Sequence, residues 1–507
     1  MTSIKSAIAV CLTTATISSC AQPVDGLASA PGARPFENPM STIEGVLNSS
    51  AKRICGEHFI SGFNVEDIKT AISSENDWGD IPPNMSERVP TTAELIEKAL
   101  AEASVDLQKK LVTLKAGPYS GRAKYYGDQG CVILHPLADD AFFTPVSVPR
   151  PQFTDDLFPD TGDMLIGNGN LPEGYQRADL QSAIEAAFDP EGHTLSLLVM
   201  HKGQVVIERY REDITKDTPS LNWSMGKSIL GMLIGRLEQM GEVSLDDPAP
   251  IAAWNMLPGD PRSEIKIIDL MRMSGGLQCT RHTPPWEQRG GLFDEHNVIY
   301  FAPINVIDHA IYSPFKHAPN KGWQYNNCDM QALGAIIKDK ISERGEDYLT
   351  WPYVELYNKI GMSGMVSELD TYGNFHLTGF DYGTARDWAR YGLLYLNDGV
   401  WNGERLLSKN FVASANMAGP IWSSDIGEYS EEKFMYGSTH WINDRGALPL
   451  PRDAFWALGY GGNYAIITPS EDLVIVLLRL TNNDDRTNDQ TRTVLNLLMK
   501  GLDIQIN

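Results

Sequence analysis

The sequence predicts an α+β fold, in which an antiparallel sheet is flanked by helices and carries a helical subdomain, preceded by a small N-terminal α+β domain. Three observations predict this fold. Two predicted strands on either side of a turn at 201–204 predict a hairpin at 195–200 and 205–210. A second hairpin is predicted near the C-terminus, at 464–468 and 473–480. Helical patterns fill the chain between them, so we expect the two hairpins to form one sheet assembled from distant segments.

The expected elements follow in chain order. The first domain is expected to hold a helix at 91–103 and strands at 109–114 and 131–135. Helices of the second domain are predicted at 177–188, from Ser224 to about Gly241, at 330–341, at 386–397 and at 491–502. Apolar residues cover most of the circumference of the helix that follows Ser224, which indicates a buried helix.

Length and composition predict the domain organisation. A chain of 507 residues is too long for one ordinary core and suggests two domains with connections. We predict an export signal at 1–20, a tether rich in Ala, Pro and Gly at 21–45, an N-terminal accessory domain at 46–145, a linker at 146–175 and a second domain at 176–507. The net charge of −23 comes from dispersed acidic residues, so nucleic acid is not an expected partner.

The first twenty residues have the pattern of an export signal. Lys5 precedes a short apolar stretch at 7–17, and Ile17-Ser18-Ser19-Cys20 resembles a bacterial lipobox, in which the cysteine is acylated after cleavage. The alternative is ordinary cleavage near Ala21. The pattern favours a periplasmic lipoprotein that touches a bacterial membrane only through lipidated Cys20, because the apolar stretch is too short to span a bilayer.

The remaining cysteines suit an oxidising compartment. Beyond Cys11 and Cys20 the chain has Cys55, Cys131, Cys279 and Cys328, which allow up to two disulfides in three connectivities. The pairing that respects the domain boundaries is Cys55 with Cys131 and Cys279 with Cys328. Their spacing does not resemble a zinc site, and we expect neither a metal nor a cofactor.

Ser224 and Lys227 form a Ser-x-x-Lys motif at the start of the buried helix. Residues three apart on a helix project from one face, so the hydroxyl and the amine can meet. Burial disfavours a charged amine, and a neutral amine can activate a serine nucleophile. The same spacing also occurs, without an apolar helix behind it, at Ser49/Lys52, Ser263/Lys266, Ser313/Lys316 and Ser430/Lys433.

Two further motifs could complete a catalytic site. Tyr325 begins a Tyr-x-Asn motif with Asn327 just ahead of a predicted helix, whereas the matches at Tyr372/Asn374 and Tyr395/Asn397 lie in a loop and within a helix. Near the second hairpin the chain reads Gly459-Tyr460-Gly461-Gly462-Asn463, where glycines would let substrate approach a strand edge. This segment also reads as a tight turn at the start of a strand.

The order Ser-x-x-Lys, Tyr-x-Asn, Gly-rich segment resembles the serine β-lactamase and penicillin-binding-protein superfamily over about 176–505. It is most similar to the class C branch with the esterases and 6-aminohexanoate-dimer hydrolases. The resemblance implies a β-lactamase/transpeptidase-like fold, Ser224 as nucleophile, Lys227 as base and Tyr325 as general acid/base. It further implies that Asn327 contacts the substrate amide and that the backbone N–H groups of Ser224 and Asn463 form the oxyanion hole.

One position departs from the class C pattern. Tyr460-Gly461-Gly462 stands where class C β-lactamases carry Lys-Thr-Gly, so the cation suited to a β-lactam carboxylate is replaced by a phenol. We therefore expect an exported serine hydrolase that cleaves a small ester or amide through an acyl-enzyme. The alternatives are a β-lactamase or D-Ala-D-Ala carboxypeptidase, and a non-hydrolytic sensor whose partner binds residues 46–145.

Overall fold

The computed structural model describes residues 42–75, 90–151, 158, 171–189, 192–279, 295–423, 434–480 and 486–506. The predicted signal at 1–20 with Cys20 and nearly all of the predicted tether lie outside these ranges, as do Ser430 and Lys433. Among the helices of the described part, none is long and apolar enough to cross a membrane.

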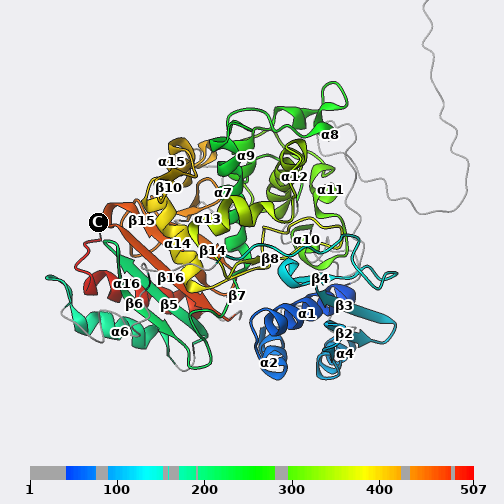
Figure 1. Cartoon of the computed structure of the whole chain (residues 1–507), viewed down its shortest axis with the longest axis horizontal. Coiled ribbons are helices and arrows are strands. Elements are labelled where there is room, and N and C mark those ends of the chain that lie inside the picture. The colour runs from blue at the N-terminus through cyan, green and yellow to red at the C-terminus, as the bar shows by residue number, and fades with distance from the viewer. Residues whose placement is uncertain are drawn as a thin grey trace, which may run out of the picture.

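One seven-stranded antiparallel sheet organises the C-terminal part, in the order β12-β13-β14-β15-β16-β5-β6 (Figure 1). Its strands are β5 Thr194–His201, β6 Gln204–Tyr210, β12 Met435–Tyr436, β13 Trp441–Ile442, β14 Phe455–Gly459, β15 Asn463–Thr468 and β16 Leu473–Arg479. β16 pairs with β5, so both predicted hairpins join in one sheet. The predicted assembly of the sheet from distant segments is confirmed.

Helices cover both faces of this sheet, which explains why β5 and β16 are buried along their whole length. Side chains alternate between faces along a strand. On β16, Leu473, Ile475 and Leu477 pack toward α6 (Arg177–Ala187) and α16 (Arg486–Gly501). The intervening residues Val474 and Val476 belong to the larger core on the other side, together with α14 (Ala385–Leu396).

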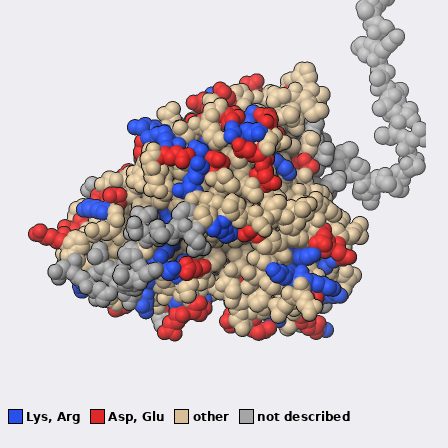
Figure 2. All heavy atoms as spheres, in the orientation of Figure 1, with Lys and Arg blue, Asp and Glu red and all other residues tan. Residues whose placement is uncertain are grey.

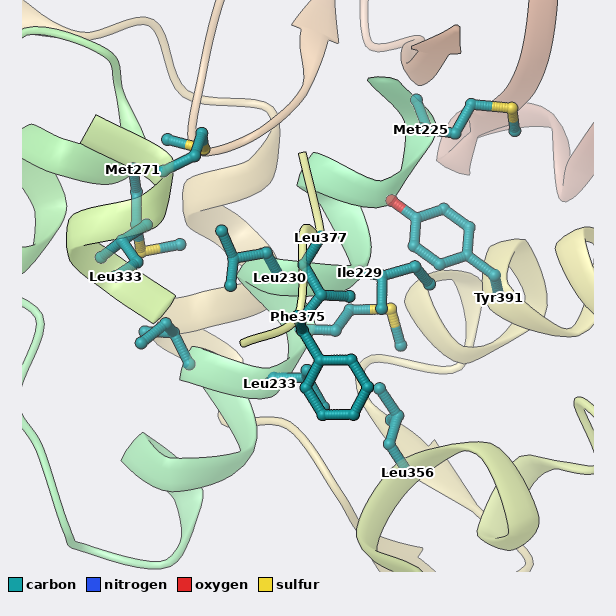
Figure 3. Close-up of a cluster of buried hydrophobic side chains, with 14 of the residues drawn as sticks. Met225, Ile229, Leu230, Leu233, Met271, Leu333, Leu356, Phe375, Leu377 and Tyr391 are labelled. Atoms are coloured by element: carbon teal, nitrogen blue, oxygen red, sulfur yellow. The ribbon is translucent and has the colours of Figure 1, made fainter. Parts of the chain in front are cut away.

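The helical subdomain surrounds α7 (Gly226–Gln239), the helix behind the predicted nucleophile. Its other helices are α8 Ala252–Asn255, α9 Ile267–Met271, α10 Glu295–Phe301, α11 Val306–Ile311, α12 Asn327–Glu343, α13 Asn358–Ile360 and α15 Lys409–Ala415. Apolar side chains of α7 such as Ile229, Leu230 and Leu233 lie in the centre of the large core (Figure 3). The predicted burial of this helix is confirmed.

Short strands lie around the helical subdomain. β7 Ser220–Leu221, β9 Asp381–Gly383 and β8 Val366–Ser367 form a three-stranded sheet in the order β7-β9-β8, and β10 Val400–Trp401 pairs with β11 Glu404–Arg405. Because β7 directly precedes the predicted nucleophile, the small sheet ties that segment to residues 381–383.

The N-terminal segment has a core of its own. It consists of α1 Thr42–Phe59, α2 Val65–Glu75, α4 Pro90–Ala101, β1 Ser104–Asp106, β2 Leu111–Ala116, β3 Tyr119–Tyr125 and β4 Cys131–Ile133. The strands form a four-stranded sheet covered by α1, which also contacts α10 of the C-terminal part (Figure 1). α1 begins at Thr42, inside the predicted tether, and α1 and α2 had no counterpart in the sequence analysis.

The described part of the predicted linker is bound to the protein. Val148 N donates to Asp128 Oδ2 at 2.9 Å, and Arg150 Nε donates to Asp128 Oδ1 at 3.0 Å. Phe158 is buried, with the guanidinium of Arg390 4.7 Å from its ring centroid.

Over the face shown in Figure 2, acidic and basic side chains are interspersed.

Candidate active site

Ser224 lies on a tight turn that links β7 to α7. The turn is a single 3-10 turn, Trp223–Met225, and Trp223 has a left-handed backbone with φ of 50°. Asn222 N donates to Asp381 O at 2.8 Å, which anchors the turn to β9. Ser224 is half-buried, whereas the neighbouring Trp223 and Met225 are buried. The strand, turn and helix therefore present one hydroxyl at a partly open surface.

Lys227 lies in the first turn of α7 and is 1% exposed. Its Nζ donates to Ser224 Oγ at 3.0 Å, to the hydroxyl of Tyr300 at 3.2 Å and to Thr378 O at 2.5 Å. The predicted meeting of Ser224 and Lys227 is present in the structure. Three acceptors around one buried amine fix its position beside the serine.

Tyr325 lies beside Lys227. The Lys227 Nζ is 4.9 Å from the centroid of the Tyr325 ring, and this ring stacks on Trp441 with centroids 5.5 Å apart. Tyr325 directly precedes Asn326, whose side chain caps α12 by accepting from Asp329 N. The phenol therefore stands next to a helix start, as the sequence predicted.

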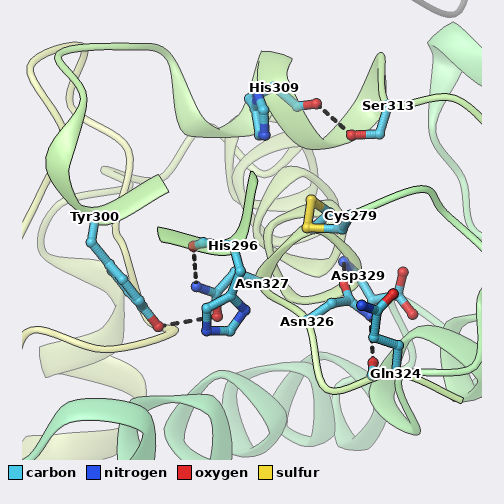
Figure 4. Close-up of a disulfide and its surroundings, with 10 residues drawn as sticks. Cys279, His296, Tyr300, His309, Ser313, Gln324, Asn326, Asn327 and Asp329 are labelled. Carbon is cyan, nitrogen blue, oxygen red and sulfur yellow. Dashed lines mark hydrogen bonds between the residues drawn. A yellow bond between two sulfur atoms is a disulfide. The ribbon is translucent and has the colours of Figure 1, made fainter. Parts of the chain in front are cut away.

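Tyr300 is a site residue that sequence reasoning missed. It lies on α10, and its hydroxyl oxygen is 3.0 Å from Asn327 Oδ1 (Figure 4) and 2.5 Å from Thr378 O, so its single proton is donated to one of these two acceptors at a time. Burial raises the pKa of Tyr300 above its ordinary value, while its hydrogen bonds to Thr378, Asn327 and Ser224 act in the opposite direction. Tyr300 is therefore a protonated donor at neutral pH. No motif marks it, since only the fold brings α10 to Lys227.

Asn327 is fully buried at the first position of α12. Its Oδ1 accepts from Tyr300, and its Nδ2 donates to His296 O at 2.7 Å (Figure 4). Both ends of the amide are thus engaged by the protein. A contact between Asn327 and substrate stays a prediction, and it requires one of these bonds to be exchanged.

The Gly-rich segment is a turn. Tyr460, Gly461 and Gly462 connect β14 to β15, and Gly459 pairs with Asn463 across the hairpin. Both turn glycines have positive φ, 77° and 80°, which other residues rarely adopt. The turn packs against the residue that precedes Ser224, because the exposed Tyr460 ring lies edge-on to Trp223 with centroids 5.6 Å apart. Asn463 is buried, and its side chain donates to Tyr460 O at 2.9 Å.

A cluster of aromatic residues lies beside Tyr325. Trp441 on β13 contacts Tyr436 and Trp323 with ring centroids 5.2 and 6.0 Å apart, and Trp323 contacts Trp422 at 5.0 Å. This cluster lies next to the phenol of Tyr325. Trp323, Trp422 and Tyr436 are buried, and Trp441 is partly exposed.

The predicted disulfides and the other Ser-x-x-Lys motifs are placed as follows. Cys55 is bonded to Cys131 and Cys279 to Cys328, the pairing that respects the domain boundaries.

Of the other Ser-x-x-Lys motifs in the described part, Lys52 forms an ion pair with Glu368, and Ser313 donates to His309 O. Within the ranges given above, no group of three or more His, Cys, Asp and Glu side chains could hold a metal ion.

Comparisons with known proteins agree with this geometry. The family model of the β-lactamases matches residues 183–498, a range that contains Ser224, Lys227, Tyr325 and the 460–462 turn. A 6-aminohexanoate-dimer hydrolase of Paenarthrobacter ureafaciens is 23% identical over 334 residues, covering 59% of this chain and 74% of that protein.

Two solved structures share the fold. A β-lactamase candidate from Bacteroides dorei DSM 17855 matches with a TM-score of 0.52 and 19% identity, over 65% of this chain and 99% of its own. A penicillin-binding protein homologue from Caulobacter crescentus matches with a TM-score of 0.50 and 13% identity, over 66% of this chain and 99% of its own. The N-terminal segment 42–151 precedes the residues matched by the family model.

Proposed function

This chain belongs to the β-lactamase family and is a hydrolase of the serine β-lactamase and penicillin-binding-protein superfamily, and from that premise we propose that it cleaves a small ester or amide through an acyl-enzyme on Ser224. The observation that carries the proposal is the 3.0 Å hydrogen bond from Lys227 Nζ to Ser224 Oγ at the start of a buried helix.

In the first half-reaction the neutral amine of Lys227 takes the proton of Ser224, and Oγ attacks the substrate carbonyl. Backbone N–H groups of Ser224 and Asn463 hold the resulting oxyanion. The phenol of Tyr325 delivers a proton to the leaving alcohol or amine. In the second half-reaction the same groups activate a water, which releases the acid and restores Ser224.

The substrate class follows from the residues around the turn. Tyr460 is 47% exposed at the position where class C β-lactamases carry a lysine, so this edge of the site offers a neutral phenol. Trp441, the partly exposed member of the aromatic cluster, favours an apolar acyl or leaving group. A small uncharged ester or a linear amide fits these features better than a β-lactam, whose carboxylate lacks a cationic partner here.

We further propose that the protein is exported and anchored by a lipid on Cys20. Support comes from the lipobox-like Ile17-Ser18-Ser19-Cys20 and from the two cysteine pairs of the described part, since disulfides persist in oxidising compartments. Metabolic labelling with a palmitate analogue should mark the wild type and not Cys20→Ala. Labelling of neither protein would contradict the anchor.

The catalytic proposal is tested with p-nitrophenyl butyrate and nitrocefin, using wild type and Ser224→Ala. We expect ester turnover in the wild type alone and no turnover of nitrocefin. Turnover of nitrocefin would instead assign a β-lactamase. Folded wild type that turns over neither substrate, nor a panel of linear amides, would contradict the proposed hydrolase and favour a sensor.

A further inference from the structure

Lys52 is a buried cation at the junction between the N-terminal segment and the catalytic part. It lies on α1 with 0% exposure, and its Nζ is 3.4 Å from Glu368 Oε2. The same Nζ lies 4.5 Å from the centroid of the Phe380 ring, which is cation–π geometry. Both partners belong to the catalytic part. A buried lysine is costly unless it is paired, so this position calls for an explanation.

Glu368 receives two groups from the N-terminal segment. Its second oxygen accepts a hydrogen bond from Cys131 N at 2.7 Å. Cys131 is joined by a disulfide to Cys55, which lies on α1 one turn after Lys52. Lys52 and Cys131 therefore both bind the carboxylate of Glu368, and the two segments that carry them are joined by the Cys55–Cys131 disulfide.

The segment 378–381 connects this junction to the catalytic groups. Phe380 has a left-handed backbone, with φ of 60°, and its ring contacts Trp223 at 4.8 Å and Tyr300 at 5.7 Å between centroids. Two residues earlier, Thr378 O accepts from Lys227 and from Tyr300. One residue later, Asp381 O anchors the nucleophile turn. Lys52 thus holds one side of a segment whose other side holds the catalytic pair.

Asp381 places a carboxylate beneath the start of α7. It is fully buried, and a Cβ on Gly226 would lie 1.8 Å from its Oδ2, so only glycine fits there. Burial raises the pKa of Asp381 to about 7, and the charges of Lys227 and Lys52 act in the opposite direction. The carboxylate therefore lies in the electrostatic field of the catalytic lysine and of the N-terminal lysine together.

We propose that Lys52 is a positioning residue for the catalytic pair, through which the N-terminal segment holds residues 378–381 and makes itself an integral part of the hydrolase. The charged groups around Lys52 are Glu368, Asp370 and Asp381, with His376 also within its field. This inference rests on the proposed function of Ser224 and Lys227. It assigns to 42–151 a structural contribution to catalysis instead of a separate binding role.

The test compares kcat and KM for ester hydrolysis in Lys52→Met, Glu368→Gln and the double variant. Lys52→Met leaves Glu368 buried without its cation, so loss of stability is expected alongside loss of activity. The double variant removes both charges and should regain stability. If Lys52 positions the catalytic pair, the double variant still shows kcat lowered about 10- to 100-fold with KM unchanged, because small displacements of catalytic groups are costly.

Arg53→Met is the matched control. Arg53 is the adjacent buried cation on α1, and its Nε donates to Glu57 Oε1 at 2.9 Å within the same helix. This variant should lower the melting temperature and leave kcat within about threefold of wild type. Glu368→Gln leaves Lys52 buried without its anion and should also lose stability. It keeps the Lys52 cation over Phe380, so the folded variant should retain kcat within about threefold and provides the reference if Lys52→Met alone does not fold.

The proposal is overturned if the folded double variant has the kcat of Glu368→Gln, because Lys52 would then serve only the stability of the junction. Equal losses of kcat in the double variant and in Arg53→Met would overturn it as well. Failure of the proposed function is recognised separately, since wild type itself would then lack ester turnover. Wild-type turnover combined with an unaffected double variant rejects this inference alone.

Discussion

At the scale of single residues, the two phenols near Lys227 have different environments and therefore different expected roles. Tyr300 is enclosed, its hydroxyl has two fixed acceptors within hydrogen-bonding distance, and burial keeps the pKa of that hydroxyl high. Tyr325 lies against the amine of Lys227 and the aromatic cluster. We infer that Tyr300 orients Lys227 and Asn327, whereas Tyr325 exchanges protons with substrate and water.

Replacing each phenol by Phe should separate these roles. Tyr325→Phe removes the general acid/base and should lower kcat by about 10²- to 10⁴-fold with little change in melting temperature. Tyr300→Phe leaves Asn327 Oδ1 without this donor, and an unsatisfied buried acceptor costs about 1–3 kcal/mol of stability. Its kcat should fall less than that of Tyr325→Phe. The opposite order of kcat losses would reverse the two assignments.

Tyr460→Lys restores the cation found in class C β-lactamases. Tyr460 is exposed at the turn beside Trp223, so a lysine fits without burial. A hydrogen bond to a charged group is worth about 1.5–3 kcal/mol, so nitrocefin turnover, which we do not expect of wild type, should become measurable in Tyr460→Lys. Hydrolysis of p-nitrophenyl butyrate, which has no carboxylate, should change little. An equal change with both substrates would show that the residue at position 460 does not discriminate between substrates by their charge.

The sequence predicts the catalytic residues that lie in spaced motifs and no others. Ser224 and Lys227 are one helical turn apart, so their contact follows from local geometry. Tyr300 and Thr378 reach the same amine from segments 73 and 151 residues away from Lys227. Such contacts depend on tertiary packing, and Thr378 acts through its backbone oxygen, which any residue could supply.

At the scale of elements, periodicity predicts best where apolar residues face one core. The two hairpins and helices α6, α7, α14 and α16 lie within a few residues of their predicted bounds, except that α16 begins at Arg486 rather than 491. α1 was missed because its sequence mixes buried apolar residues with Asn48, Ser50 and Lys52, all of them buried against neighbouring segments. Its polar residues look like a solvent-exposed stretch until their tertiary partners are known.

Asp329 in the first turn of α12 predicts a pH dependence of stability. Burial raises its pKa to about 7, from an ordinary value of 3.8, while Gly275 N donates to its Oδ2 at 3.0 Å. Between about pH 4 and 7 the folded protein holds a proton that the unfolded chain has lost, so this group's contribution to stability falls as pH rises.

The isosteric variant Asp329→Asn cannot titrate at this position. Its melting temperature should therefore fall less than that of wild type between about pH 5 and pH 7, and it should exceed wild type at the higher pH. Thermal scans at both pH values, with exposed Asp67→Asn in the first turn of α2 as control, check this expectation. Parallel curves for wild type and Asp329→Asn would show that the carboxyl titrates normally.

At the scale of the whole molecule, the N-terminal segment and the catalytic part are joined through buried polar contacts. Asn48 Nδ2 donates to Phe301 O at 3.0 Å, next to Tyr300, in addition to the Lys52 and Cys131 contacts with Glu368. The sequence predicts an N-terminal accessory domain at 46–145. In the structure, α1 of this segment contacts the helix that carries Tyr300.

The disulfide between Cys55 and Cys131 should stabilise this junction. It closes a loop of 76 residues, for which chain entropy gives about 4 kcal/mol. The double variant Cys55→Ser/Cys131→Ser should melt at least about 5 °C below wild type, and its ester turnover should be lost at a lower temperature. The double variant Cys279→Ser/Cys328→Ser, which removes the disulfide within the catalytic part, serves as the comparison. An unchanged melting temperature of Cys55→Ser/Cys131→Ser would show that this disulfide does not contribute to the global stability of the protein.

The central claim, that Ser224 is an activated nucleophile, is tested most directly by mass spectrometry after reaction with a fluorophosphonate. We predict one adduct per folded chain, located on the peptide that contains Ser224, formed by wild type and absent from Ser224→Ala. Lys227→Met should react at least about 10²-fold more slowly, because the amine that accepts the serine proton is gone. Folded wild type that forms no adduct, or forms one that survives in Ser224→Ala, would contradict the mechanism.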